Sequence, residues 1–191
     1  MAGDLFESEL AEHLAVAQAV RGGLAVPFAA MRKLWLSTIQ GGGKILFFGN
    51  GGSAGDAQHL ATELTIRYSR DRKPIAAIAL TTDSSALTAG GNDLGFEKVF
   101  ARQLEALGRK GDLAFGISTS GRSPNVLAAF TMARSMGIAT AALTGAGPHK
   151  LPDYCDHILA VPSTVTARIQ EMHITLGQML CAALEQDLGL V

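Results

Sequence analysis

A glycine-rich stretch between an expected strand and an expected helix is the feature that most restricts how this chain can fold. The stretch reads Phe48-Gly49-Asn50-Gly51-Gly52-Ser53-Ala54-Gly55-Asp56. It follows a short apolar run, residues 44–48, and it continues into residues 54–68, which have the pattern of a helix. A strand that breaks into glycines and restarts as a helix exposes backbone N–H groups at the positive end of the helix dipole. The stretch therefore predicts an anion site, most often one for phosphate.

The rest of the chain alternates between apolar runs of strand length and segments with helical spacing. Strands are expected at residues 44–48, 75–80, 113–117, 138–143 and 158–161. Helices are expected between most of them, with residues 81–93 forming a loop around a short helix at 84–89 and a long helix at 166–188 closing the chain. Strands separated by helices predict a parallel sheet that is covered on both faces. The fold class is therefore α/β: a five-stranded parallel sheet flanked by helices in a three-layer sandwich.

The first part of the chain adds helices to this core. Residues 5–20 carry apolar side chains at helical spacing, and a second helix is expected to start near Pro27 and to end at residues 41–43. We expect the pair to pack on the sheet or against a neighbouring subunit. At 191 residues the chain has the length of one domain. The sequence predicts residues 1–43 as an N-terminal helical pair and residues 44–191 as the α/β core of that single domain.

Composition excludes several classes of partner. The formal net charge is −1, which does not indicate binding to nucleic acid or to a membrane surface. No apolar run approaches the ~20 residues that span a bilayer. The N-terminal residues 1–9 are acidic rather than basic, and the two cysteines have neither metal-ligand spacing nor a disulfide pattern. The sequence predicts a cytoplasmic protein. Hydrophobic residues make up 48% of the chain and charged residues 17%, which suggests that other subunits cover some apolar surface.

A second polar turn follows the third expected strand. It reads Ser118-Thr119-Ser120-Gly121-Arg122-Ser123 and leads into a helix. Ligands of open parallel sheets bind outside the carboxyl ends of the strands, so this turn and the first loop are candidates for one site. Hydroxyl residues around a glycine at a helix start can donate O–H and N–H bonds to phosphate oxygens. Each loop alone could equally be an ordinary helix cap, since Ser and Thr are favoured there. Two such loops at adjacent strand ends favour phosphate binding.

The first loop also fits the dinucleotide pattern G-x-G-x-x-G/A through Gly49, Gly51 and Ala54. That pattern alone is weak evidence. A dinucleotide site needs an acidic residue about 20 positions later, at the end of the second strand. The second strand ends in Leu80-Thr81-Thr82, and Asp83 lies too far along. The dinucleotide interpretation is therefore disfavoured.

Two groups of polar residues on expected helices are candidates for acid–base chemistry or metal binding. His59 and Glu63 are four residues apart and share one helix face, close after the first loop. Such a pair is commonly a surface or packing pair, and its position next to a phosphate loop is what favours function. The second group is residues 168–173 on the last helix, which could equally be the solvated face of that helix.

Taken together, these motifs resemble a known family. The first loop with Asp56-Ala57-Gln58-His59 and Glu63, the residues 79–84, the pair Asn92-Asp93, the second loop and Arg168-Ile169-Gln170-Glu171 are similar to sugar-isomerase (SIS) domains, and specifically to the phosphoheptose isomerase family. The resemblance covers nearly the whole chain. It implies a homotetramer with sites between subunits. It also implies conversion of sedoheptulose 7-phosphate to D-glycero-D-manno-heptose 7-phosphate, the first step towards nucleotide-activated heptoses and the lipopolysaccharide core.

The resemblance also implies roles for individual residues. Glu63 and His59 would be catalytic, with Glu63 moving a proton between C1 and C2 through an enediol. The phosphate would be held by Ser53, Ser118, Thr119, Ser120 and Ser123. The sugar would be held by Asn50, Gly51, Gly52, Asn92, Asp93 and Gln170. A divalent metal, typically zinc, would be bound by His59, Glu63, Gln170 and a residue eight positions after Gln170.

That last position is where this sequence departs from the family. The family has a histidine there that is a metal ligand and a second acid–base group, whereas this chain has Gln178. A glutamine amide coordinates weakly and does not exchange a proton near neutral pH. The departure keeps a second hypothesis open: a non-catalytic SIS protein that resembles the proteins associating with the replication initiator DnaA. The intact first loop, His59, Glu63 and residues 118–123 favour the enzyme.

Overall fold

The computed structural model describes residues 2–191, with side chains from residue 4 onward. The elements run in the following order: α1 (Ala2–Gly23), α2 (Ala25–Gln40), β1 (Ile45–Gly49), α3 (Gly52–Thr65), β2 (Ala77–Ala79), α4 (Ser84–Leu94), η1 (Phe96–Lys98), α5 (Val99–Leu107), β3 (Leu113–Ser118), α6 (Pro124–Ser135), β4 (Ala139–Gly145), η2 (Leu151–Asp153), β5 (His157–Val161) and α7 (Thr166–Asp187). The strands form one five-stranded sheet in the order β2-β1-β3-β4-β5, and every pair is parallel. The predicted fold class is confirmed.

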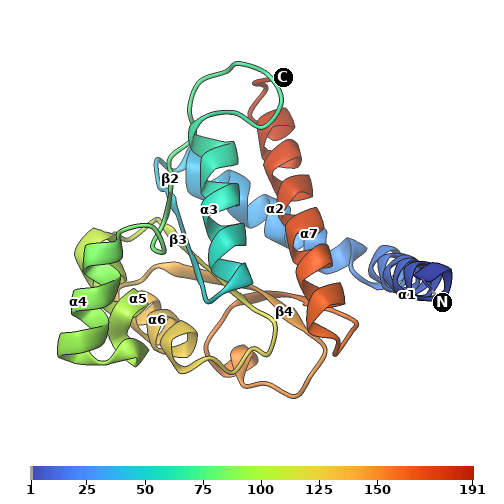
Figure 1. Cartoon of the computed structure of the whole chain (residues 1–191). Helices are drawn as coiled ribbons and strands as arrows, with labels where there is room; N and C mark the ends of the chain where they lie inside the picture. Colours follow the sequence, from blue (N-terminus) through green and yellow to red (C-terminus); the bar gives the residue numbers. More distant parts are fainter. Residues whose placement is uncertain (1) are drawn as a thin grey trace.

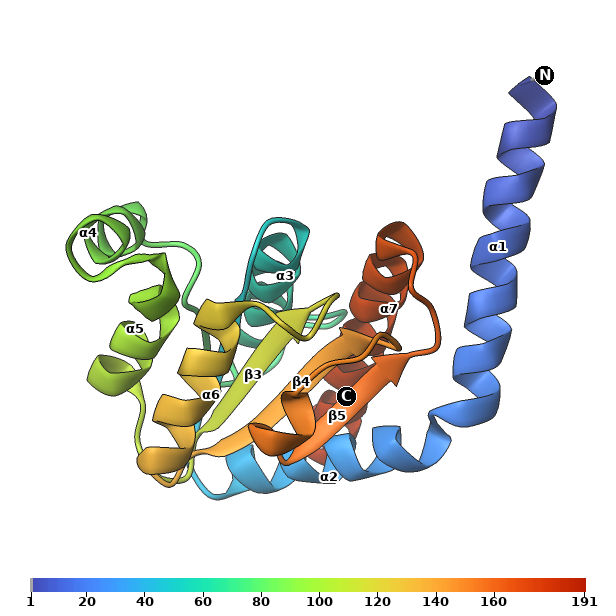
Figure 2. The same cartoon turned by 90° about the horizontal axis from the view of Figure 1, so that it is seen from below.

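Helices cover both faces of the sheet, as Figures 1 and 2 show. Alternate strand residues point to opposite faces, so Phe47 and Phe48 of β1 belong to different cores. Phe47 packs with Trp35 of α2 and with Leu60 and Leu64 of α3, in a core that α7 completes. Phe48 packs with side chains of α5 and α6 on the other face. The β1 strand is fully buried, as expected for a strand covered on both sides.

The N-terminal helices contribute unequally to this core. The α2 helix lies along the sheet, and its Met31 and Trp35 are fully buried. The α1 helix projects from the body in Figure 2. It contacts α7 through the apolar side chains of Val16, Ala17 and Val20, and through polar contacts of Glu9 and His13. Within residues 2–191, no single helix is long and apolar enough to cross a membrane. Helices α1 and α2 meet that test only as a pair, which is bent by 73°.

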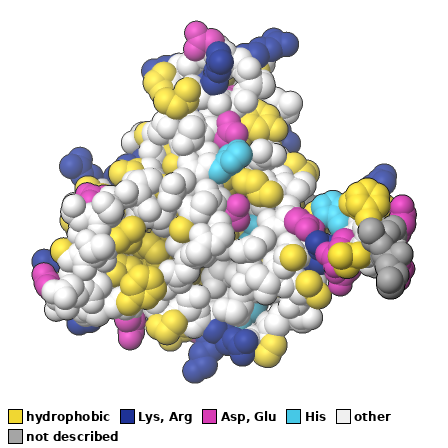
Figure 3. Space-filling model, viewed as in Figure 1, with side chains coloured by type: hydrophobic (Ala, Val, Ile, Leu, Met, Phe, Trp, Pro, Cys, Tyr) yellow, Lys and Arg dark blue, Asp and Glu magenta, His cyan; other side chains and the backbone are white. Residues whose placement is uncertain are grey.

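The segment after β2 differs from the expectation. Residues 84–94 form one helix, α4, which continues through Gly90 and Gly91 instead of ending at residue 89. Asp83 caps its start by accepting a hydrogen bond from the backbone N–H of Ala86 at 2.9 Å. Packing of Gly90 near Val99 of α5 offsets the low helix propensity of glycine, and the helix ends at Gly95, where φ is 88°. Hydrophobic side chains gather over this α4–α5 region and on α1 in Figure 3.

Candidate active site

The two predicted loops lie side by side because of the strand order. β1 is flanked by β2 on one side and by β3 on the other. After β1 the chain continues to β2 on one side of β1, and it then crosses to β3 on the other side. Loops that leave adjacent strands in opposite directions form the crevice in which open α/β sheets bind ligands. Residues 50–53 and 118–123 occupy the two sides of that crevice.

The loop after β1 is a tight glycine turn into α3. Gly51 precedes the helix with a φ of 56°, a backbone conformation that favours glycine. At Gly49 a side chain would bring its Cβ to 2.6 Å from the carbonyl oxygen of Ile117, so only glycine allows β1 and β3 to approach here. The backbone N–H of Ser53 donates to the Asn50 carbonyl at 3.0 Å, and Ser53 is buried. The glycine turn predicted at the start of α3 is therefore present, and its use as an anion cradle stays a prediction.

The loop after β3 is held by its own hydroxyl groups. The backbone N–H of Gly121 donates to Ser118 Oγ at 3.2 Å, and Ser118 Oγ lies 3.3 Å from Ser123 Oγ. Gly121 has a φ of 60°. The Ser120 side chain accepts a hydrogen bond from the Arg122 N–H at 3.3 Å and is exposed. The loop presents hydroxyl and N–H groups at the start of α6, as anion binding requires.

A pair of asparagines joins the two loops. Asn50 Nδ2 donates to Asn125 Oδ1 at 2.8 Å, and Asn125 Nδ2 donates to Asn50 Oδ1 at 2.8 Å. Asn125 lies in the first turn of α6 and is buried. Asn125 was not among the site residues predicted from the sequence. The sequence signal for it is an amide side chain two residues after Ser123, at the expected start of a helix.

The helices α3 and α7 bring the acid–base candidates together. His59 Nε2 lies 2.8 Å from Glu63 Oε1, and Gln178 Nε2 lies 3.3 Å from His59 Nε2. The close approach depends on Gly177, where a Cβ would come within 2.7 Å of the Leu60 methyl carbons. The two helices stand next to each other in Figure 1. His59, Glu63 and Gln178 thus form one cluster across the α3–α7 contact.

Gln170 lies at the other end of that contact. Its side-chain amide covers Gly52, where a Cβ would collide with Gln170 Nε2. Gln170 is eight residues from Gln178, which corresponds to ~12 Å along a helix. Of the four predicted metal ligands, the structure therefore groups His59, Glu63 and Gln178, and it places Gln170 beside the glycine turn that follows β1. Among the described residues, no group of three or more His, Cys, Asp or Glu side chains is arranged to hold a metal ion.

Asp56 is an additional carboxylate at this site. It lies on α3, one turn before His59. Burial raises the pKa of Asp56 to about 6, while the nearby His59 lowers it. Its Oδ2 atom is buried, with no hydrogen-bond partner among the side chains and backbone of residues 2–191. Asp56 belongs to the family motif in the sequence, but the burial that raises its pKa depends on the packed structure.

Asn92 and Asp93 lie apart from the other predicted residues of the same chain. Both are exposed on α4, and Asn92 Nδ2 donates to Asp93 Oδ1 at 2.6 Å. In Figure 1, α4 lies on the opposite side of the molecule from α7. The structure of the single chain does not bring this pair to the crevice, so its role in binding sugar stays a prediction.

Comparisons with known proteins identify the family. The sequence profile of the SIS domain family matches residues 10–145. A phosphoheptose isomerase from Paramagnetospirillum magneticum is 52% identical over 179 residues, which cover 94% of this chain and 93% of that relative. One from Campylobacter jejuni subsp. jejuni (serotype O:6, strain 81116) is 51% identical over 183 residues, 96% of this chain and 98% of the relative. This chain belongs to the phosphoheptose isomerase family of SIS domains.

Solved structures of phosphoheptose isomerases agree with the fold. The structure from Neisseria gonorrhoeae is 42% identical, with a TM-score of 0.91, and the match covers 97% of this chain and 100% of that chain. The structure from Francisella tularensis is 35% identical, with a TM-score of 0.94, and the match covers 97% and 99%. The phosphoheptose isomerase family was the one indicated by the sequence motifs, so that prediction is confirmed.

Proposed function

We propose that this chain is an aldose–ketose isomerase that converts sedoheptulose 7-phosphate to D-glycero-D-manno-heptose 7-phosphate. The observation that carries the proposal is that one helix, α3, begins in an intact anion cradle and carries the His59–Glu63 pair near its other end. The enzyme names of relatives that match over nearly the whole chain support it. They favour the isomerase over a non-catalytic protein resembling the DnaA-associating proteins. The product would feed nucleotide-activated heptose and lipopolysaccharide core synthesis.

The phosphate would be held where the two loops meet. Ser53, Ser118, Thr119, Ser120 and Ser123 would supply hydroxyl and backbone N–H donors. The helices α3 and α6 begin in these two loops, so the positive ends of both helix dipoles lie there. The predicted sugar contacts divide into two sets. Asn50, Gly51, Gly52 and Gln170 lie beside this phosphate site in the same chain. Asn92 and Asp93 are exposed on α4, where a second subunit could use them.

Glu63 is suited to move the proton. As a carboxylate it would remove a proton from C1 of the ketose, whose electrons then form the C1=C2 bond while the C2 oxygen takes up a proton. The carboxylic acid then returns the proton to C2 as the C1 hydroxyl loses its proton, which yields the aldose. His59, at 2.8 Å from Glu63, would orient the carboxylate and exchange protons with the sugar oxygens.

We propose that zinc binds weakly at this cluster. His59 and Glu63 are residue types that bind zinc well, and the amide groups of Gln170 and Gln178 are weaker donors. Gln178 lies close enough to His59 to share an ion with it, and a rotation of its amide would present the oxygen. When bound, zinc would polarise the sugar oxygens as a Lewis acid. This donor set fits a loosely held ion.

We also propose a homotetramer with sites at subunit interfaces. Two surfaces of the single chain support a covering subunit. Helix α1 exposes Leu5, Phe6, Leu10 and Leu14, and no residue of α4 is buried. Sedimentation velocity would test the assembly. Mixing subunits that carry Glu63→Gln with subunits that carry Asp93→Asn would test whether one site draws on two chains, because only shared sites regain activity. A cytoplasmic location stays a prediction from the sequence.

The decisive test of function is conversion of sedoheptulose 7-phosphate by the purified chain, with and without added zinc. We expect aldose product in both conditions, faster with zinc. No product under either condition would refute the enzyme and leave the binding module. In that case, a calorimetric titration with the substrate would still detect the phosphate site.

A further inference from the structure

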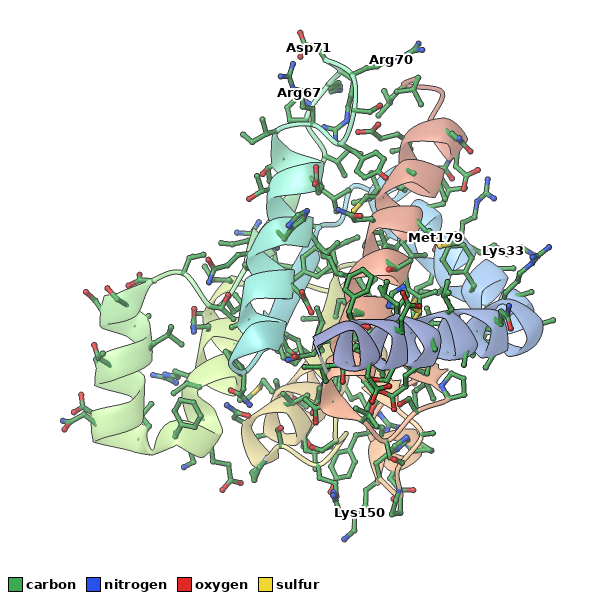
Figure 4. The ribbon with its side chains drawn as sticks, turned by 45° about the vertical axis from the view of Figure 1, so that its right-hand side comes forward. Lys33, Arg67, Arg70, Asp71, Lys150 and Met179 are labelled. Atoms are coloured by element: carbon green, nitrogen blue, oxygen red, sulfur yellow. The ribbon has the colours of Figure 1, made fainter. Side chains whose placement is uncertain are left out.

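The loop between α3 and β2 contains an arginine that turns away from solvent. Residues 66–76 form this loop, and Arg67, Arg70 and Asp71 project outward at its tip in Figure 4. Arg72 follows directly and points inward, with only 1% of its side chain exposed. A buried guanidinium in a polar loop requires several partners, because burying an unpaired charge is costly.

The partners of Arg72 are at the end of α3. Its Nη2 donates to the Glu63 carbonyl oxygen at 2.6 Å, and its Nη1 donates to the Leu64 carbonyl oxygen at 2.8 Å. The last carbonyl groups of a helix lack partners within the helix, and a cation there also complements the helix dipole. Arg72 therefore completes the C-terminal turn of α3, and it does so at the backbone of Glu63 itself.

The same guanidinium is attached to α7. Arg72 Nε donates to Glu185 Oε1 at 2.7 Å, and the backbone N–H of Tyr68 donates to that oxygen at 3.2 Å. The Glu185 side chain is also 1% exposed. Glu185 lies seven residues, or ~10 Å along the helix, beyond Gln178. Arg72 thus connects the turn that carries Glu63 to the helix that carries Gln178.

We propose that Arg72, together with Glu185, is a positioning residue for the Glu63 carboxylate; this rests on the catalytic role of Glu63 in the proposed function. A buried ion pair is a poor source of stability, since packed apolar side chains often stabilise as much or more. The pair instead fixes the position of the last turn of α3 relative to α7. The planar fork of arginine reaches two carbonyls and a carboxylate at once, which neither lysine nor an apolar side chain can do. A displacement of about 1 Å at a catalytic group can cost about 100-fold in rate.

The first test replaces the fork but keeps the charge. We expect Arg72→Lys to lower kcat by about 10- to 100-fold and to leave KM within about twofold. KM should hold because the phosphate loops lie at the opposite end of α3. The matched control is Arg32→Lys. Arg32 makes a two-bond pair with Asp187, at 2.7 and 2.6 Å, and this pair joins α2 to α7 rather than to α3. We expect the control to keep its kcat. An unchanged kcat in Arg72→Lys would overturn the proposal.

The second test separates position from stability. The double variant Arg72→Met/Glu185→Leu removes both charges and refills the volume, so it leaves no unpaired buried charge, and its melting temperature should lie above that of Arg72→Met alone. We expect its kcat to stay low even so. Recovery of kcat together with stability would show that the pair is merely structural.

A third readout does not depend on turnover. Amide hydrogen exchange of residues 63–68 should be at least about tenfold faster in Arg72→Lys than in the parent chain, and unchanged in Arg32→Lys. If the parent chain does not isomerise the sugar phosphate, the proposed function fails, and exchange alone then decides whether Arg72 fixes this turn. Equal exchange in the parent and Arg72→Lys would refute the positioning role.

Discussion

Asn50 and Asn125 each donate a hydrogen bond to the other's side-chain oxygen, at 2.8 Å in both directions. The pair crosses the crevice between the loop after β1 and the first turn of α6. Each loop is shaped by local hydrogen bonds, the pairing of β1 with β3 brings the two loops together, and this asparagine pair joins them directly. We therefore expect the two amides to hold the spacing of the proposed phosphate site.

Asn125→Ala should loosen the site as well as the fold. Its loss removes two hydrogen bonds and leaves the Asn50 amide without its partner, at a cost of about 1–3 kcal/mol in unfolding free energy. We expect KM for the sugar phosphate to rise several-fold while kcat changes less. Urea denaturation and steady-state kinetics measure the two effects. Thr131→Ala, on the exposed face of the same helix, is the control and should change neither. An unchanged KM would show that the loops hold their spacing without the pair.

Glu63→Gln should abolish turnover and preserve binding. The amide has nearly the size of the carboxylate but cannot accept the C1 proton, so we expect kcat to fall by about 1,000-fold or more. Substrate affinity, measured by calorimetry, should change by less than about threefold, since the phosphate donors are untouched. Glu105→Gln removes an exposed carboxylate on α5 and serves as the comparison. Retention of more than a tenth of the activity in Glu63→Gln would assign the proton transfer to another group.

Gln178→His should strengthen metal binding. The imidazole would replace a weak amide donor 3.3 Å from His59, and we expect zinc affinity to rise by at least about tenfold, with a gain in activity. Competition against a chromophoric chelator measures the affinity. Met179→His places the same group on the exposed neighbouring position of α7, labelled in Figure 4, and should not alter it. Equal zinc affinity in the two variants would show that residue 178 does not reach the ion.

His173 predicts a pH-dependent stability. Burial lowers the pKa of His173 from 6.5 to about 4. His173 is therefore protonated near pH 6.5 in the unfolded chain but only near pH 4 in the folded chain. Stability falls as the pH drops through that window.

The size of the effect can be measured by difference. Between pH 7 and pH 5 the free energy of unfolding should fall by about 2 kcal/mol because of His173. In chemical denaturation of His173→Leu, the free energy of unfolding should fall correspondingly less between the same two pH values. If the free energy of unfolding falls by the same amount in the parent chain and the variant, His173 takes up its proton at the same pH in the folded and unfolded states, which would contradict the prediction.

The strand–loop–helix units could be predicted from the sequence because local chemistry determines them. The apolar run before Gly49 can only be a buried strand, and the glycines after it can only be a turn. The start of helix α4 was predicted from the sequence, but its continuation to residue 94 was not, since Gly90 and Gly91 oppose a helix locally and packing against α5 offsets that preference. The distances between side chains on different helices could not be predicted from the sequence either. The sequence shows His59 and Gln178 as separate residues, and only the Gly177–Leu60 contact explains why they meet.

The burial of the Arg72 side chain could not be predicted from the sequence either, because it also depends on how helices pack. In the sequence it is one of several charged residues in a polar loop, next to Arg70 and Asp71, which are exposed. Its partner Glu185 lies on a helix more than a hundred residues later, among apolar positions. A pair of this kind follows from the packing of α3 on α7, and no local pattern distinguishes it from a solvated surface charge.

The helix α3 also acts as a spacer. Its first turn belongs to the phosphate cradle and its last turn holds Glu63, and the ten residues from Ser53 to Glu63 correspond to ~15 Å of rigid rod. The two ends cannot approach each other without breaking helical hydrogen bonds. In the proposed function, a sugar phosphate anchored at the first end must be long enough to bring its carbonyl carbon to Glu63. We therefore expect a phosphorylated ketose two carbons shorter to bind by the same phosphate but to react more slowly, because the length of α3 would set the length of the carbon chain.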